Sequence, residues 1–313
     1  MNKSNIQKIL SIGLGAQASA WCLNLRDSGS EVHVFLRDKS PNFKKAKELG
    51  LEIVTEQTVD FNAYDFILLL IPDDSHLDFL KKYEKVMSDL NIIYAHGFSL
   101  HYQAIQDLYP RHNHILLAPK AIASEVRFNY ETKSPLAAVI SFEHMSHNKK
   151  ETSEKIDILL KSLGVTEVLE RSFKEETEAD LFSEQAILCS LIPFGAKIAF
   201  EKMLERGISK ELAYIECWHE TRLIANAMID KGPIEFFKLI SPNALVGGLK
   251  AREKLLDDKY LKSLDVIFDN IQSGQFFHDL KNINFQNERS EVIKELDSHP
   301  LTKTYENFGR KIK

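Results

Sequence analysis

Short apolar runs alternate with stretches of helical periodicity through the first half of the chain. The runs are apolar at almost every position, which is typical of buried parallel strands. Strands are predicted at residues 8–12, 32–36, 66–71, 91–95, 114–118, 136–141 and 166–169. Helices are predicted between several of them, at residues 18–27, 43–49, 76–87 and 149–163. This alternation predicts an α/β fold whose mostly parallel sheet is covered by helices on both faces.

The pattern changes near Arg171. Strand signals end there, and long amphipathic stretches follow at residues 176–205, 209–230 and 242–256. Pro193 falls inside the first of these stretches, and it predicts a kink because proline cannot donate a helical hydrogen bond. At roughly 150 residues per domain, the length accords with two domains. We predict an α/β domain at residues 1–171 and an all-helical domain at residues 172–313.

The amino-acid composition mainly excludes certain classes of partner and location. Lys and Arg total 40 against 45 Asp and Glu, a net charge of −5, so a nucleic-acid partner is not expected. The longest apolar run, residues 66–71, is too short to cross a membrane. The three cysteines lack metal-ligand spacing and fit a reducing cytosol. We therefore expect a cytoplasmic protein with a small-molecule partner and no membrane contact.

A glycine-rich turn follows the first predicted strand. It reads Gly13-Leu14-Gly15-Ala16-Gln17-Ala18, the dinucleotide-binding pattern with alanine in the third glycine position. In this pattern the first glycine allows the tight turn, the second lets the backbone approach a pyrophosphate, and the third small residue packs the helix on the strand. The helix N-terminus offers unpaired N–H groups to anionic oxygens. A Rossmann-type nucleotide site is therefore predicted; the alternative is a plain tight turn.

The second predicted strand ends in a mostly basic loop, Arg37-Asp38-Lys39-Ser40. An acid at this strand tip would bind the ribose hydroxyls of NAD, whereas Arg, Lys and Ser suit the additional phosphate of NADP. Three of the four residues favour NADP, and Asp38 favours NAD. NADP is the predicted cofactor, with a solvated polar loop as the alternative.

Two pairs of acids lie at i,i+4 spacing on predicted helices: Asp180 with Glu184, and Glu216 with Glu220. Four residues advance a helix by about 400°, so each pair projects from nearly the same face. Oxygen ligands without nearby Cys or His favour Mg²⁺ or Mn²⁺ over zinc. Apolar residues flank both pairs, and acids in such surroundings are costly to bury unless they are paired or bind metal. The alternative is a solvated acidic helix face.

One acidic segment is more distinctive than the glycine turn. Residues 173–185 read FKEETEADLFSEQ. In this segment, and over nearly its whole length, the chain resembles the ketol-acid reductoisomerases, which serve the synthesis of the branched-chain amino acids isoleucine and valine. Other matching stretches are residues 13–29, Ile71-Pro72-Asp73, His96-Gly97-Phe98, Ala118-Pro119-Lys120, residues 213–220 and Ile240-Ser241.

The resemblance implies a metal and substrate site. Two Mg²⁺ ions would be held by Asp180, Glu184, Glu216 and Glu220, the last two donated by a partner subunit. Ser241 would touch the substrate carboxylate. The catalytic residues would be His96, Lys120 and Glu220, and the cofactor-binding residues Gly13, Gly15, Ala16, Gln17, Arg37, Lys39, Ser40, Pro72 and Asp73.

The length resembles that of the short form of the family, whose helical domain is knotted and interlocks as a dimer. The implied substrate is a 2-acetolactate-type acid, in which two metal ions would drive alkyl migration before NADPH reduces the rearranged ketone. Two stretches depart from the family. Ala121-Ile122-Ala123-Ser124 replaces Gly-Pro-Gly-His after Lys120, and Leu245 replaces an acid.

Two alternatives therefore stay open. One is a related NADP-dependent 2-keto acid reductase that does not isomerise its substrate. The other is a non-catalytic nucleotide-binding relative. Retention of all four acids argues against the second, because a protein without catalysis has no physical need for four carboxylates that are costly to hold together.

Overall fold

The structure is a computed structural model that describes residues 6–312 of the chain. It divides into two compact units, Met1–Thr177 and Glu178–Lys313. The predicted boundary at Arg171 stays a prediction. Across the described residues, every helix is too short or too polar to cross a membrane.

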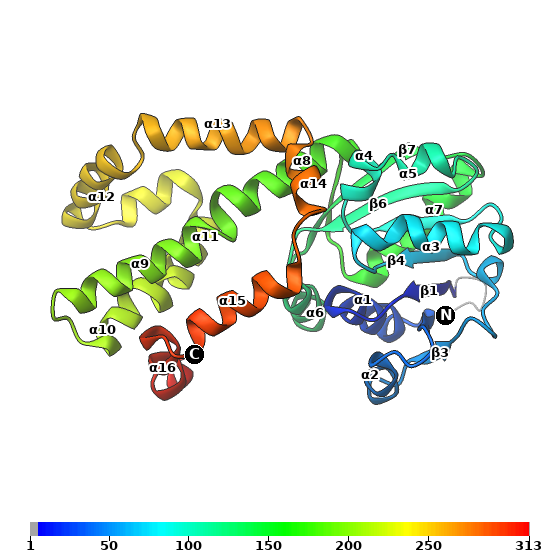
Figure 1. Cartoon of the computed structure of the whole chain (residues 1–313), viewed down its shortest axis with the longest axis horizontal. Coiled ribbons are helices and arrows are strands. Elements are labelled where there is room, and N and C mark those ends of the chain that lie inside the picture. Colours follow the sequence, from blue (N-terminus) through cyan, green and yellow to red (C-terminus); the bar gives the residue numbers. More distant parts are fainter. Residues whose placement is uncertain (1–5, 313) are drawn as a thin grey trace. The chain divides into compact units, whose positions relative to one another are not determined.

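An eight-stranded sheet forms the centre of the first unit (Figure 1). The strand order is β3-β2-β1-β4-β5-β6-β7-β8. Neighbouring strands are parallel except for β6 and β7, so the mostly parallel sheet is confirmed. The strands are β1 (Lys8–Ile12), β2 (Glu31–Phe35), β3 (Glu52–Val54), β4 (Phe66–Leu69), β5 (Asn91–Tyr94), β6 (Asn113–Pro119), β7 (Ala137–His144) and β8 (Glu167–Glu170).

Helices cover both faces of this sheet. The side chains of successive strand residues therefore pack alternately into two separate apolar clusters. In β4, Phe66 and Leu68 join one apolar cluster, while Ile67 and Leu69 join the other. Such alternation is the pleat of a strand buried on both sides. The helices are α1 (Ala16–Asp27), α2 (Asn42–Glu48), α3 (His76–Tyr83), α4 (Phe98–Tyr102), α5 (Ile105–Leu108), α6 (Ala123–Thr132) and α7 (Lys149–Leu163), with 3-10 turns η2 (Phe61–Ala63), η3 (Asp73–Ser75) and η4 (Glu84–Val86).

The second unit is all-helical, as predicted. Its first helix, α8, begins in the first unit and continues into the second. The helices are α8 (Phe173–Ser183), α9 (Leu191–Glu205), α10 (Lys210–Tyr214), α11 (Glu220–Leu239), α12 (Pro242–Leu255), α13 (Asp258–Gln272), α14 (Gln275–Leu280), α15 (Phe285–Asp297) and α16 (Pro300–Asn307), with the 3-10 turn η7 (Gly309–Lys311).

Two π-helical turns interrupt the long helical stretches that the sequence predicts. These are η5 (Glu184–Leu188) and η6 (Ile215–His219). The N–H of Cys189 donates to the carbonyl of Glu184 over 2.9 Å, five residues back instead of four. The backbone then breaks at Ser190, and Pro193 lies in the first turn of α9, where a missing N–H costs no hydrogen bond. The interruption expected at Pro193 thus lies just before it, between two helices.

Two histidines at the amino end of β6 are fully enclosed. His112 accepts a hydrogen bond from the N–H of Leu90 (3.2 Å), and His114 lies between the Tyr94 hydroxyl (2.9 Å) and the Tyr109 carbonyl (3.0 Å). Burial, aided by the Arg111 charge, lowers the pKa of His112 to about 4. Burial lowers the pKa of His114 to about 3. Both imidazoles are therefore neutral in the folded protein.

We predict that stability falls as pH drops from about 6.5 to about 5, because the unfolded histidines bind protons in this range and the folded ones do not. Each such histidine contributes at most about 1.4 kcal/mol per pH unit. Urea unfolding across this range checks the slope. His114→Gln should reduce it, and a slope identical to that of the wild type would contradict the assignment.

Candidate active site

The glycine turn after β1 is shaped as the sequence predicts. Gly13 has a φ of 87°, and its N–H donates to the Phe35 carbonyl over 3.1 Å. A Cβ on Gly13 would lie 2.8 Å from Ile71 Cγ2, whereas a Cβ on Gly15 would meet nothing within 4 Å. Helix α1 begins at this turn without a side-chain cap or an acid in its first turn. Its open N-terminus therefore fits a bound anion such as a pyrophosphate.

The loop after β2 is a turn that presents cations. The Ser40 N–H donates to the Arg37 carbonyl over 3.0 Å, and Lys39 has a φ of 60°. Arg37 and Lys39 are both exposed. The Asp38 carboxylate, which alone favours NAD, accepts a hydrogen bond from the Gln57 amide over 3.1 Å. The turn is therefore better suited to an additional phosphate than to ribose hydroxyls.

Lys45 is a further basic residue at this turn, and no sequence motif singles it out. It lies on α2, and its Nζ is 3.3 Å from the Leu14 carbonyl oxygen and 3.5 Å from that of Gly15. The ammonium therefore stands over the glycine turn, where a pyrophosphate would bind. No local motif marks it, because only the packing of α2 brings it to the turn.

The segment after β4 carries Pro72 and Asp73 and is held by His76. The His76 Nε2 donates to the Ile71 carbonyl over 3.0 Å, and its Nδ1 lies 2.7 Å from the Ser99 hydroxyl. Burial is the main cause that lowers the pKa of this imidazole. A neutral histidine, which the sequence did not single out, thus fixes against α4 the loop that carries Pro72 and Asp73, two predicted cofactor-binding residues.

Glu176 is the buried centre of the site. Its side chain is 0% exposed, and one oxygen lies 2.6 Å from Nζ of Lys120, whose side chain is 33% exposed. The other oxygen accepts from the Gly97 N–H over 3.1 Å. A Cβ on Gly97 would collide with the Thr177 hydroxyl and lie 3.0 Å from the Phe173 carbonyl. The carboxylate thereby joins the ends of β5 and β6 to α8, and it is a site residue that the sequence does not single out.

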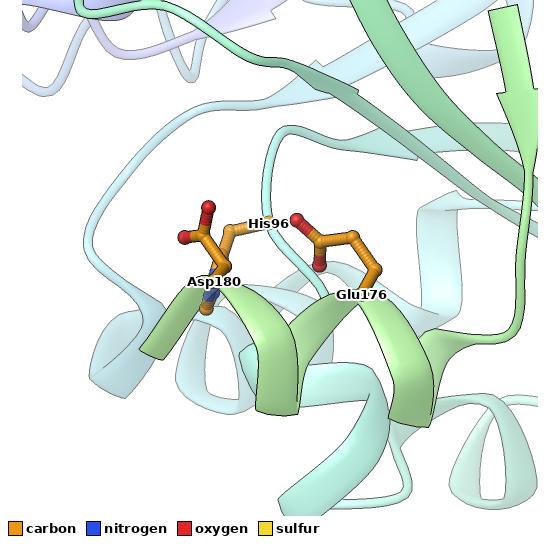
Figure 2. A group of neighbouring side chains, drawn as sticks. All are labelled: His96, Glu176 and Asp180. Atoms are coloured by element: carbon orange, nitrogen blue, oxygen red, sulfur yellow. The ribbon is translucent and has the colours of Figure 1, made fainter. Parts of the chain in front are cut away.

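His96, Glu176 and Asp180 form a group that could hold a metal ion (Figure 2). One ligand atom from each lies within 4.8 Å of the others. Glu176 and Asp180 project from successive turns of α8, and His96 follows β5. The group therefore brings the predicted catalytic His96 to the predicted metal ligand Asp180.

The other predicted metal ligands lie outside this group. Glu184 opens the π turn η5, Glu216 lies inside η6, and Glu220 follows it. Burial first, and then the charges of Glu184 and Asp180, raise the pKa of Cys189, so both carboxylates lie near enough to act on this thiol. Glu184 and Glu216 are exposed in the single chain. Both pairs of acids thus adjoin a π turn, a feature that is often functional.

Ser241 and the loop after Lys120 lie at helix starts. The Ser241 Oγ accepts from the Ala244 N–H over 3.3 Å and caps α12. Ile122 is the N-cap of α6, and its side chain is 72% exposed. The loop that departs from the family pattern therefore presents an apolar side chain beside Lys120.

Comparisons with known proteins agree over both domains. The NADPH-binding domain of acetohydroxy acid isomeroreductase matches residues 5–168, and the C-terminal domain of ketol-acid reductoisomerase matches residues 173–313. The ketol-acid reductoisomerase (NADP(+)) of Helicobacter pylori is 36% identical over 297 residues, which are 91% of this chain and 88% of that protein. That of Clostridioides difficile is 34% identical over 280 residues, 86% and 82% of the two chains.

A solved structure shows the same fold over nearly the full length. It is that of an NADH-preferring ketol-acid reductoisomerase from an uncultured archean, with a TM-score of 0.82 and 24% identity. The match covers 98% of this chain and 93% of the other. Since both domains and the relatives agree, the chain belongs to the ketol-acid reductoisomerase family of oxidoreductases.

Proposed function

We propose that this protein is a ketol-acid reductoisomerase that uses NADPH and two Mg²⁺ ions. It catalyses alkyl migration in a 2-acetolactate-type acid and then reduces the product to a 2,3-dihydroxy acid, a reaction of isoleucine and valine synthesis. The observation that carries the proposal is the placement of Asp180, from the distinctive acidic segment, beside His96 and Glu176. The identity to Helicobacter pylori ketol-acid reductoisomerase over 91% of the chain supports it.

The residues fit the metal that the reaction needs. Asp180, Glu184, Glu216 and Glu220 supply carboxylate oxygens, the ligands that Mg²⁺ prefers. Asp180 and Glu220 are half-buried, and Glu184 and Glu216 are exposed. In our proposal Glu216 and Glu220 come from a second copy of the chain. When bound, two Mg²⁺ ions would polarise the ketone and hydroxyl oxygens of the substrate.

The chain's own groups would orient the substrate and manage its protons. Lys120 is held by Glu176 over 2.6 Å and presents a fixed ammonium to developing negative charge on oxygen. The His96 ring would orient the substrate beside Asp180, and Glu220 would relay the hydroxyl proton. Ser241, exposed at the start of α12, would bind the substrate carboxylate. Lys120 therefore has an electrostatic role that depends on a buried partner.

NADPH would lie along the carboxyl ends of the strands, as nucleotides do in this fold. The pyrophosphate would meet the N-terminus of α1 at Gly13, Gly15, Ala16 and Gln17, with Lys45 beside it. Arg37, Lys39 and Ser40 would bind the ribose phosphate. Pro72 and Asp73 would line the path toward the nicotinamide.

A second copy of the chain would cover the apolar surface of the helical unit. Ile198 on α9 is 55% exposed, and Ile229 and Phe237 on α11 are 81% and 56% exposed. Monomeric proteins rarely expose so many large apolar side chains in one region. We propose a homodimer in which the helical units, knotted as in the short form of the family, interlock.

The proposal also includes the domain organisation and the cellular compartment. The domains are residues 1–171, which bind the cofactor, and residues 172–313, which supply the carboxylates. The cytosol is the proposed compartment, because Cys22, Cys189 and Cys217 are all free thiols.

We predict that the purified protein oxidises NADPH when 2-acetolactate and Mg²⁺ are both present, and that Asp180→Asn abolishes this activity. The amide removes the negative charge that a metal ligand supplies, while the nucleotide turn is untouched. NADPH absorbance measures the rate, and intrinsic fluorescence measures cofactor binding, which should be unchanged. Glu175→Gln is the matched control, since Glu175 is an exposed acid on the same helix.

Full turnover in Asp180→Asn would remove Asp180 from the metal site. Oxidation of NADPH with a simple 2-keto acid but not with 2-acetolactate would support the reductase without isomerisation. Cofactor binding without turnover of any keto acid would support the non-catalytic relative.

Arg37→Ala should weaken NADPH binding by roughly tenfold or more and leave NADH binding nearly unchanged, because a charge-assisted bond to one phosphate is worth about 1.5–3 kcal/mol. Lys45→Ala should weaken both cofactors alike, since the pyrophosphate is common to both. Equilibrium fluorescence titration gives the four dissociation constants. Equal losses of NADPH and NADH in Arg37→Ala would contradict the phosphate assignment.

A further inference from the structure

Residues 300–312 build part of a small apolar core in the second unit. The buried members of this core are Phe200 of α9, Ala213 and Tyr214 of α10, and Leu301 of α16. Tyr305, Phe308 and Ile312 are among the half-buried side chains packed against it. Many other large apolar side chains of this unit are exposed. This small core therefore holds α9, α10 and α16 together within a single chain.

The contact with α10 is tightly fitted. Gly309 is buried, and a Cβ there would lie 2.6 Å from the Cζ and the hydroxyl oxygen of Tyr214. The Tyr214 and Phe308 rings meet edge to face, with centroids 6.5 Å apart. Because a side chain at position 309 would displace the tyrosine, residues 300–312 and the end of α10 have one close-packed arrangement.

A hydrogen bond extends this contact to the carboxylate segment. His219 is the last residue of the π turn η6 and lies between Glu216 and Glu220 in the sequence. Its Nε2 donates to the Ile312 carbonyl oxygen over 2.9 Å. The same turn is held from α9, where Met203 Sδ lies 3.7 Å from Cys217 Sγ. Both acids therefore flank a side chain that is anchored to the 300–312 segment.

The backbone between the two acids needs such an anchor. The Glu220 N–H donates to the Ile215 carbonyl, five residues back, so the turn is wider than that of an α-helix. π turns are rare and occur mostly as single turns within α-helices. The direction in which Glu216 and Glu220 project depends on this turn keeping its wider π-helical geometry. We attribute that geometry to contacts from outside the helix, without which the segment would form an ordinary α-helical turn.

We propose that residues 300–312 act as a brace that positions Glu216 and Glu220 for the metal ions, with His219 as the positioning residue. The inference rests on the proposed function, because it takes these two glutamates as ligands. His219 is not one of the proposed metal or substrate ligands. It acts through the backbone of η6, in the way that residues behind a metal site orient the ligands in front of them.

The test measures metal binding directly. Mn²⁺ binding to the full-length protein is followed by electron paramagnetic resonance, without substrate, and NADPH affinity is measured in parallel by fluorescence. His219→Ala should weaken Mn²⁺ binding roughly 10- to 100-fold, the range for lost supporting residues, and leave NADPH affinity unchanged. His219→Gln, which keeps a donor at similar reach, should restore most of it. His278→Ala, at an exposed histidine on α14, is the control and should bind Mn²⁺ as the wild type does.

A second variant ends the chain at Phe308 and removes the acceptor carbonyl. It should weaken Mn²⁺ binding to a similar degree, and adding His219→Ala to it should cause little further loss, because both changes remove the same hydrogen bond. The shortened chain with His219 intact keeps the proposal testable if His219→Ala fails to fold.

The variant Glu216→Gln distinguishes a failure of the brace from a failure of the proposed metal site. If Glu216→Gln binds Mn²⁺ as the wild type does, the metal assignment is wrong, and the brace is overturned with it. If Glu216→Gln loses Mn²⁺ while His219→Ala and the shortened chain retain it, only the brace is overturned. Additive losses in the double variant would also overturn it.

Discussion

One buried ion pair connects the elements on which the active site depends. The Glu176 carboxylate has no exposed surface and lies 2.6 Å from the Lys120 ammonium, while its second oxygen binds the Gly97 backbone. A carboxylate taken out of water costs several kcal/mol unless its charge and lone pairs are satisfied. The ends of β5 and β6 must therefore meet the first turns of α8, and Asp180 follows one turn later. The N-terminus of α8 is fixed in the same unit, where Glu143 accepts from the Phe173 N–H over 2.5 Å.

The sequence predicted the elements whose pattern is local. The glycine turn, the parallel sheet and the change to helices all follow from periodicity and from residue types at fixed spacing. Strand β3 was missed because Glu52–Val54 is too short to show a period. Helix α6 was missed because it buries only Val126 and so has little apolar pattern. Both omissions show that a local signal weakens when an element is short or buries few residues.

Prediction of the site residues also depended on whether each residue has a local sequence signal. Asp180 and His96 were predicted as site residues from their match to the family's motifs, and those roles stay predictions. The structure adds Glu176, Lys45 and His76 through contacts with Lys120, Leu14 and Ser99, which lie 56, 31 and 23 positions away in the sequence. No spacing rule connects these pairs. The π turns were also beyond prediction, since the i,i+4 pairs fit an ordinary helix equally well. In the proposed function Glu216 and Glu220 join Asp180 through a second copy of the chain, and residue spacing along one chain carries no information on contacts between copies.

In the proposed function, acids from α8, η5, η6 and α11 converge on a pair of divalent ions beside a bound dinucleotide. The most direct measurement is anomalous diffraction from crystals of the protein grown with Mn²⁺ and NADPH. Two manganese peaks are expected, with Asp180 and Glu184 from one copy and Glu216 and Glu220 from another among the ligands. Crystals that bind NADPH but show no manganese at these carboxylates would contradict it.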